Sequence, residues 1–425
     1  MLPEKFKQRM MRLLGEEYPD FERALLEGAA ERAIRANPLK GAGEEIIGEL
    51  KIDGEPIPYV KGGYFLPEGA VGIGNTPTHH SGKIYVQDPG AMASAAALDI
   101  KEDMWVADLC AAPGGKSTQA AAFLGEGGFI LSNEYVPKRA KILVGNFERM
   151  GIRNGMVTSL DTARLGELFD SVFDIVIADA PCSGEGMFRK EVPAIEEWSE
   201  ENVIACKARQ TEILSNAAGM VKEGGELLYS TCTYSLSENE EVIDEFLASH
   251  PDFRLREVPK SIIDATACGI QFEGARTGEL HLCRRFYPHK SRGEGQFLAL
   301  MERVTAGKPK INFRDSAKPL SAAERNATDA FFRENLIRPP RGRVAKHGSN
   351  LVLIPHECPI PSFGVFSAGV LLGELRGSVL VPSHQFFSAY GELFLRREII
   401  DDEKRAEKYL RGEEIDAESF KQNGF

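Results

Sequence analysis

The chain has 425 residues, a formal net charge of −12, 43% hydrophobic residues and 27% charged residues. This length exceeds what one hydrophobic core usually supports, and the composition is typical of a folded protein of more than one domain. The seven cysteines are scattered without a Cys-x-x-Cys pair, which argues against a disulfide framework, a zinc ribbon or another metal site and favours free thiols in a reducing compartment.

Residues 1–84 are predicted to form a small N-terminal α+β segment. Apolar side chains recur at helical spacing up to about residue 35, and Gly and Pro then interrupt residues 38–82. The N-terminus lacks the apolar core of a signal peptide, and no apolar run approaches the length of a membrane span. We therefore expect a cytoplasmic protein without a membrane partner.

Strand, turn and helix alternate from residue 85 to about residue 304. Continuous apolar runs, separated by helical segments, occupy residues 105–107, 129–131, 173–179 and 226–230. Such strands indicate a parallel sheet that helices cover on both faces. The run at residues 296–301 indicates a late, antiparallel edge strand. The fold class predicted for this part is α/β.

A basic region follows that domain. From Thr305 to Asn350 ten Lys or Arg residues stand against four Asp or Glu residues, a local charge of +6. Such a cluster suits RNA phosphates, although a solvated surface is the commoner explanation for a single charge run. We assign residues 305–362 to a basic linker or small domain. Residues 363–425, with short apolar runs and frequent glycines, are predicted to form a compact, mostly β domain.

The segment DLCAAPGGKS, residues 108–117, leads from a strand through a glycine turn into a helix. Its Gly-Lys-Ser ending favours the phosphate loop of an ATPase, but Cys110 occupies the place of the first glycine and would crowd a β-phosphate. The alternative is a nucleoside-binding loop, with Glu134 at the end of the next strand as the acid that binds ribose hydroxyls. S-adenosylmethionine carries that ribose, and the order of elements favours this second interpretation.

Two cysteines follow strand-like runs, in DAPCSG (residues 179–184) and STCTYS (residues 230–235). Because α/β sheets do their chemistry at the carboxyl ends of their strands, we expect both thiols at one edge of the sheet. Cys182 and Cys232 have polar neighbours, unlike a typical buried structural cysteine. Arg189 and Lys190 are expected to supply positive charge near them, which favours a thiolate. Asp179 is placed to bind an exocyclic amine or a ring nitrogen.

Paired thiols beside a methyl-donor pocket suit methylation of cytosine at C5. Attack of a thiolate on C6 makes C5 nucleophilic, and a second thiol can assist release of the adduct, whereas amine or oxygen methylation needs no thiol. Pro181 precedes Cys182, which is the order found around the attacking cysteine of DNA cytosine methyltransferases, so the residues alone leave open which thiol attacks. A non-catalytic RNA-binding protein is a further alternative, and the two intact cysteines count against it.

The three segments together resemble the signature motifs of the NOL1/NOP2/Sun family of RNA cytosine-C5 methyltransferases, over about residues 85–304. EGMFRK at residues 185–190 is similar to the bacterial RsmF-like group of that family, which acts on 16S ribosomal RNA, and RANP at residues 35–38 resembles the family's N-terminal RNA-binding element. The resemblance implies S-adenosylmethionine as cofactor and 16S rRNA or the small ribosomal subunit, not DNA, as partner. Another RNA such as tRNA is the alternative substrate.

The resemblance also implies roles for individual residues. Cys232 would be the attacking nucleophile, Cys182 would help to release the product, and Asp179 would serve both the base and the cofactor. The implied cofactor-binding residues are Cys110, Ala111, Ala112, Pro113, Gly114, Gly115, Lys116, Glu134, Arg139, Asp161 and Asp179. The expected architecture is a Rossmann-like methyltransferase sheet, with an RNA-binding N-terminal segment and a PUA-like, RNA-binding C-terminal domain.

Overall fold

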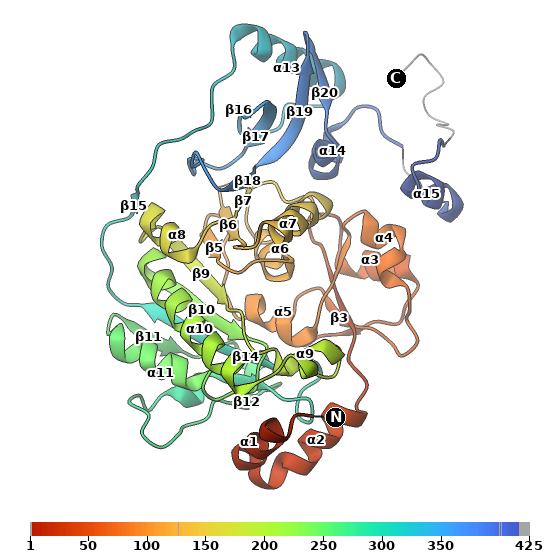
Figure 1. Ribbon diagram of the computed structural model, residues 1–425. Coiled ribbons are helices and arrows are strands. Elements are labelled where there is room, and N and C mark those ends of the chain that lie inside the picture. The colour runs from red at the N-terminus through yellow and green to blue at the C-terminus, as the bar shows by residue number, and fades with distance from the viewer. Residues whose placement is uncertain (1, 126, 399, 401, 416–425) are drawn as a thin grey trace.

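A mixed sheet forms the centre of the computed structural model, which describes residues 2–125, 127–398, 400 and 402–415 (Figure 1). Its strand order is β12-β13-β14-β10-β9-β5-β6-β7-β18, with β11 paired to β14 beside this path. The five parallel strands are β5 (Trp105–Asp108), β6 (Phe129–Asn133), β7 (Gly155–Thr158), β9 (Phe173–Asp179) and β10 (Val221–Thr231). They confirm the predicted Rossmann-like α/β fold class.

Helices cover both faces of this sheet. They are α5 (Pro89–Ala96), α6 (Gly115–Ala121) and α7 (Pro137–Met150), whose apolar residues share one core, and α8 (Thr162–Leu168), α10 (Glu200–Met220) and α11 (Glu240–Ser249), whose apolar residues share another. Side chains of the central strands alternate between the two cores, so the strands are buried on both faces. That burial explains their continuous apolar sequences.

The remaining strands of the sheet run antiparallel to this centre. They are β14 (Gln296–Arg303), β13 (Arg284–Phe286), β12 (Ala267–Cys268) and β11 (Phe253–Arg256). β14 pairs with β10 on one side and with β13 and β11 on the other. Its predicted antiparallel direction is confirmed, but its predicted edge position is wrong, because two further strands cover that side. The short elements β8 (Phe169–Asp170), α9 (Val192–Glu196) and α12 (Lys260–Ile263) connect these parts.

The N-terminal residues form two helices and a small sheet. The elements are α1 (Glu4–Leu14), α2 (Tyr18–Glu27), β1 (Ala33–Ala36), α3 (Gly43–Leu50), β2 (Glu55–Pro56), β3 (Gly63–Phe65), α4 (Pro77–His80) and β4 (Ile84–Val86), with sheet order β2-β3-β1-β4. Helices α1 and α2 place their apolar faces on the part of the chain that carries the central sheet, residues 85–304, which we call the catalytic part after its expected role. There Phe21 meets the ring of Tyr234 edge-on at 5.0 Å. This packing fixes the N-terminal unit to the loops that follow the central strands.

The C-terminal part contains a four-stranded sheet of its own, in the order β16-β17-β19-β20 (Figure 1). Its elements are α13 (Ala322–Asn335), β16 (Arg343–His347), β17 (Asn350–Ile354), β19 (Val370–Arg376), β20 (Val379–Pro382), α14 (His384–Tyr390) and α15 (Glu403–Leu410). β16 and β17 precede the predicted boundary at residue 363 and yet belong to one sheet with β19. The sheet therefore begins inside the segment expected to be a basic linker or small domain. Residues 416–425 of the predicted C-terminal domain lie outside the described residues.

One strand of this C-terminal part leaves its own sheet. β18 (Val365–Ala368) pairs antiparallel with β7 at the edge of the central sheet, and Val365 lies opposite Thr158. Gly369 has a φ of +63°, and a Cβ there would lie 2.2 Å from the Leu353 carbonyl oxygen. Only glycine allows the chain to turn so closely from one sheet to the other. β15 (Lys310–Ile311) likewise pairs with β8 of the catalytic part.

Within the described residues, none of the helices combines the length and the apolar character required to span a membrane.

Candidate active site

The two cysteines singled out by the sequence lie against each other. Cys182 follows β9 and Cys232 follows β10, and their Sγ atoms are 3.1 Å apart. The backbone N–H of Cys232 also donates to Cys182 Sγ at 3.3 Å. Because β9 and β10 are parallel neighbours, both thiols emerge at the same sheet edge, as the sequence predicts.

A charged pair lies at the same edge. Asp179, the last residue of β9, accepts hydrogen bonds from Ser230 Oγ at 2.6 Å and from Lys116 Nζ at 2.8 Å. Burial disfavours the charged form of Lys116, but the charge and hydrogen bond of Asp179 outweigh it and raise the pKa of Lys116, with a smaller contribution from Cys232. Lys116 therefore remains a cation at neutral pH, and it links the glycine loop to the thiols.

The ionisation state of Cys182 differs from the thiolate that the sequence favours. The hydrogen bond with Cys232, burial and the charge of Glu238 raise the pKa of Cys182 well above its usual value, so Cys182 is a thiol at neutral pH. Arg189 and Lys190, expected to supply positive charge, point elsewhere: Arg189 pairs with Glu294, and Lys190 pairs with Asp88 and Glu294. That expectation is wrong, because nearby carboxylates hold both side chains.

Side chains of α7 hold two carbonyl groups of the glycine loop, residues 110–116, by hydrogen bonds. Arg139 donates to the Ala112 carbonyl at 2.8 Å and Asn146 donates to the Pro113 carbonyl at 2.8 Å. Gly114 has a φ of +116°, and a Cβ on Gly114 would approach Leu143 within 2.9 Å. This left-handed turn needs glycine, and it carries the chain from β5 into α6 close to the sheet edge.

Two carboxylates at the strand ends suit a nucleoside. The Glu134 side chain is buried at the end of β6, where it accepts from the Val136 N–H at 2.9 Å and pairs with Arg139 at 3.2 Å. Each oxygen keeps a lone pair for a ribose hydroxyl. Asp161, three residues after the last residue of β7, caps α8 by accepting from the Arg164 N–H at 2.8 Å.

A third carboxylate, Asp108, ends β5. Its Oδ2 accepts from Ser117 Oγ at 2.6 Å, whereas its buried Oδ1 has no hydrogen-bond partner among the described residues. An unpartnered polar atom, a glycine cradle and Glu134 along one sheet edge are a donor and acceptor set that fits S-adenosylmethionine. The loop also includes Cys110, whose pKa is raised by burial and by the charge of Asp108, so that it is an uncharged lining group.

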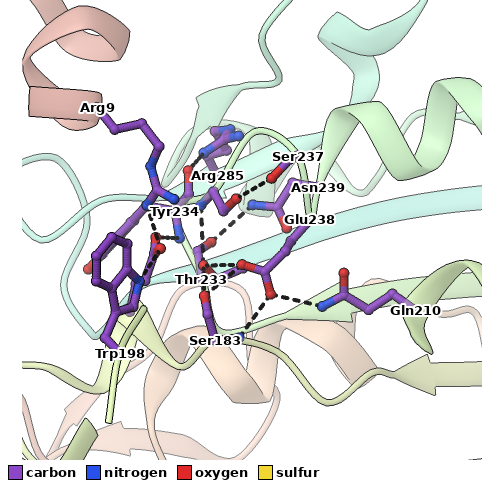
Figure 2. Close-up of polar contacts among 12 residues, drawn as sticks. Arg9, Ser183, Trp198, Gln210, Thr233, Tyr234, Ser237, Glu238, Asn239 and Arg285 are labelled. Atoms are coloured by element: carbon purple, nitrogen blue, oxygen red, sulfur yellow. Dashed lines mark hydrogen bonds and ion pairs between the residues drawn. The ribbon is translucent and has the colours of Figure 1, made fainter. Parts of the chain in front are cut away.

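Sequence reasoning missed a polar network among residues that follow the two cysteines in the chain, part of which Figure 2 shows. The buried carboxylates of Glu185 and Glu238 bind groups in the two cysteine loops. The only signal in the sequence is that polar residues crowd the segments after both cysteines, where a strand-to-helix connection needs none.

The segment at residues 35–38, which resembles an RNA-binding element, has two polar side chains that are buried in the protein. Arg35 is buried and donates to Thr118 Oγ1 at 3.0 Å and to the Gly115 carbonyl at 3.3 Å. Asn37 is buried as well, and its amide donates to the carbonyls of Gly82 and Met150 at 2.8 Å. These two side chains therefore join β1 and its loop to α6 and to the end of α7.

The basic region is partly neutralised. Arg343 pairs with Asp315 at 2.6 Å, and Lys346 pairs with Glu324 at 2.7 Å. Arg338 and Arg341 are exposed at the turn that precedes β16. The role of this region in RNA binding stays a prediction.

Known proteins are similar to this chain in sequence and in fold. The 16S rRNA methyltransferase RsmB/F family matches residues 95–302, and the N-terminal domain of 16S rRNA methyltransferase RsmF matches residues 2–89. A solved methyltransferase homolog protein from Pyrococcus horikoshii is 27% identical with a TM-score of 0.62, covering 71% of this chain and 95% of that one.

Two curated relatives are both named ribosomal RNA small subunit methyltransferase F. The protein from Aeromonas salmonicida is 30% identical over 405 residues, which is 90% of this chain and 82% of the relative. The protein from Vibrio campbellii is 33% identical over 300 residues, which is 69% of this chain, and the match spans 61% of the relative's length. The chain belongs to the 16S rRNA methyltransferase RsmB/F family.

Proposed function

We propose that this protein methylates C5 of cytosine in 16S ribosomal RNA through a covalent bond between Cys232 and C6 of the base. The observation that carries the proposal is the 3.1 Å contact between Cys182 Sγ and Cys232 Sγ, at the ends of neighbouring strands and beside the glycine loop. Methylation of oxygen or an amine needs no such pair, whereas C5 of cytosine is too weak a nucleophile to react unaided. Membership of the family supports the choice of ribosomal RNA.

The reaction assigned to Cys232 has two halves. Its sulfur adds to C6, and the electron pair of the C5–C6 double bond makes C5 nucleophilic. Bound S-adenosylmethionine supplies the methyl group that C5 accepts. S-adenosylhomocysteine is the leaving group of that transfer. Water then accepts the C5 proton, the C5–H electron pair restores the C5–C6 double bond, and the C–S electron pair returns to Cys232. Cys182, kept as a thiol, donates a hydrogen bond that stabilises the departing thiolate.

Asp179 and Lys116 suit the rest of the base. Addition of sulfur to C6 places negative charge on N3 and O2 of the ring, and a fixed cation stabilises charge that develops in this way. Lys116 is such a cation, with Asp179 only 2.8 Å from it. The Asp179 carboxylate is an acceptor for the 4-amino group, which distinguishes cytosine from uracil.

The test separates the two thiols. Cys182→Ala, Cys232→Ala and, as a control, Cys268→Ala in exposed β12 are incubated with 16S rRNA and methyl-labelled cofactor and run on a denaturing gel. We expect a protein–RNA complex to accumulate with Cys182→Ala, no complex and no methylation with Cys232→Ala, and normal turnover with the control. A complex formed by Cys232→Ala, and none by Cys182→Ala, would reverse the roles.

A second arm tests the substrate. Mass-spectrometric mapping of 5-methylcytosine after incubation with 16S rRNA or with tRNA should show the product in 16S rRNA alone. If only tRNA is methylated, tRNA and not 16S rRNA is the substrate, and the proposed methylation of cytosine C5 still holds.

A further inference from the structure

Two loops carry the cysteines: the Cys182 loop follows β9 and the Cys232 loop follows β10. A buried carboxylate from each loop accepts hydrogen bonds from the other loop. Glu238, in the loop that carries Cys232, accepts from the N–H of Ser183 at 2.8 Å and from Ser183 Oγ at 2.6 Å (Figure 2). Ser183 directly follows Cys182. In return Glu185, in the loop that carries Cys182, accepts from the N–H of Tyr234 at 3.1 Å. Each loop therefore holds the backbone of the other within one or two residues of its cysteine.

Backbone contacts alone join these loops at few points. The Gly186 N–H donates to the Cys232 carbonyl at 2.9 Å, and the Ala180 N–H donates to the Ser230 carbonyl at 3.0 Å. Beyond these points β9 and β10 have ended, so ladder hydrogen bonds no longer fix the distance between the chains. The side chains of Glu185 and Glu238 supply the remaining connections.

Both carboxylates are completely buried, and different groups compensate their charge. Glu185 pairs with Arg9 of α1 and accepts from Trp198 Nε1 at 2.9 Å. Among the described residues no Lys or Arg pairs with Glu238; Gln210 donates to it at 3.0 Å and Thr233 at 3.3 Å. A buried carboxylate with several donors is costly to displace, so its position is strongly determined.

The backbone around Glu238 is itself held. Tyr229, within β10, donates from its hydroxyl to the Glu238 carbonyl at 2.6 Å, and Asn239 donates to the Thr233 carbonyl at 3.0 Å. These bonds tie the carboxylate to the strand that ends in Cys232. Movement of the Cys182 loop away from that strand would break the bonds of Ser183 first.

We propose that Glu185 and Glu238 are positioning residues, which hold Cys182 and Cys232 in contact and thereby set the rate of the methylation step. The proposal rests on the proposed function for the roles of the two thiols. It assigns to these glutamates no contact with RNA or with cofactor. A displacement of about 1 Å between reacting groups can cost about 100-fold in rate.

The experiment uses the full chain with Glu238→Gln, and Asp244→Asn as a matched control. Asp244 is a buried carboxylate on α11 that accepts two backbone N–H groups, from Arg276 at 2.7 Å and Thr277 at 2.9 Å, away from the thiols. Glutamine turns an NH₂ donor toward groups that are themselves donors. Three quantities are measured: the single-turnover rate of RNA methylation, the Kd for S-adenosylmethionine, and the pH profile of iodoacetamide alkylation at each cysteine.

We expect Glu238→Gln to slow single turnover by about 10- to 100-fold with an unchanged Kd for the cofactor. The alkylation midpoint of Cys182 should move to lower pH, because the charge of Glu238 raises the pKa of that thiol. Asp244→Asn should leave all three quantities as in the wild type. A slower single turnover at an unchanged cofactor Kd separates a positioning role from a general loss of the fold, which would weaken cofactor binding as well.

A folded Glu238→Gln variant with the wild-type rate and alkylation profile would overturn the proposal. If that variant does not fold, Ser183→Ala removes only the hydroxyl donor, and it should slow turnover by a smaller factor; wild-type behaviour of this variant would also overturn it. A wild-type chain that methylates no cytosine refutes the proposed function instead, while the alkylation profiles still test the connection between the loops.

Discussion

The stability of the fold should depend on pH through Asp108, the acid at the end of β5. This carboxyl is buried, its Oδ1 lacks a hydrogen-bond partner in the part of the chain that the structure describes, and its Oδ2 accepts from Ser117. Burial first, and then the charge of Asp179, raise the pKa of Asp108 to about 7, although Ser117 and Lys116 oppose the shift. Asp108→Asn removes the titrating group while keeping an acceptor oxygen for Ser117.

The direction of the effect follows from proton binding. In the unfolded chain an Asp titrates near pH 3.9, so between about pH 4 and pH 7 the folded state holds a proton that the unfolded state has lost. Stability is therefore full below pH 4 and falls as the pH rises to the folded pKa of about 7. From pH 5 to pH 8 this linkage amounts to a loss of about 3 kcal/mol in the free energy of unfolding.

Urea unfolding of the wild type and of Asp108→Asn at pH 5 and pH 8 measures this loss. Fluorescence of Trp105, at the start of the same strand, reports the transition. The difference between the two proteins cancels the titration of all other groups, and it should shift by about 3 kcal/mol in favour of the Asn variant at pH 8. A difference that is the same at both pH values would refute the reasoning, since Asp108 would then be ionised throughout.

Two further predictions concern ligands. Glu134→Ala should weaken S-adenosylmethionine binding by about 1.5 to 3 kcal/mol in calorimetry, because a buried carboxylate makes charge-assisted hydrogen bonds to the ligand. The control Glu167→Ala, on the exposed side of α8, should leave the affinity unchanged. Equal affinities of the Glu134→Ala variant and the wild type would show that the cofactor loop is misassigned. Neutralising Arg338, Arg341 and Arg343 together should lower RNA affinity and reduce the salt slope by about 0.7 to 0.9 per lost phosphate contact; an unchanged slope would identify these arginines as solvated surface.

The central fold and the thiol pair could be predicted from the sequence because their signals are local. A strand buried on both faces is continuously apolar, and the first polar residues after it mark the sheet edge. Two such strands that are parallel neighbours bring Cys182 and Cys232 together, and Glu134 follows from the same rule. Glycine at the turn of Gly114 is likewise a local requirement of the backbone.

Contacts between distant segments could not be predicted in this way. Arg189 lies close to Cys182 in the sequence, which suggests a cation beside the site. Its partner Glu294 is 105 residues further along the chain, and no periodic pattern in the sequence predicts that pairing. The hydrogen bonds that Glu185 and Glu238 accept from the opposite cysteine loop also depend on how the two loops lie in the folded protein. β18 joins the central sheet because β7 offers a free edge, which the alternation of strands and helices does not reveal.

The N-terminal unit cannot be separated from the catalytic site of this protein. Arg35 from β1 binds the loop and helix that carry Gly115, and Arg9 from α1 compensates the buried charge of Glu185. Removal of this unit would take the cation from Glu185 and uncover the apolar side chains of Trp198 and Tyr234, against which α1 and α2 pack. A truncated chain that fails to bind RNA would therefore not show that the N-terminal unit binds RNA. Substitutions of exposed residues on its outer face, which leave Arg9 and Arg35 in place, are needed to decide that question.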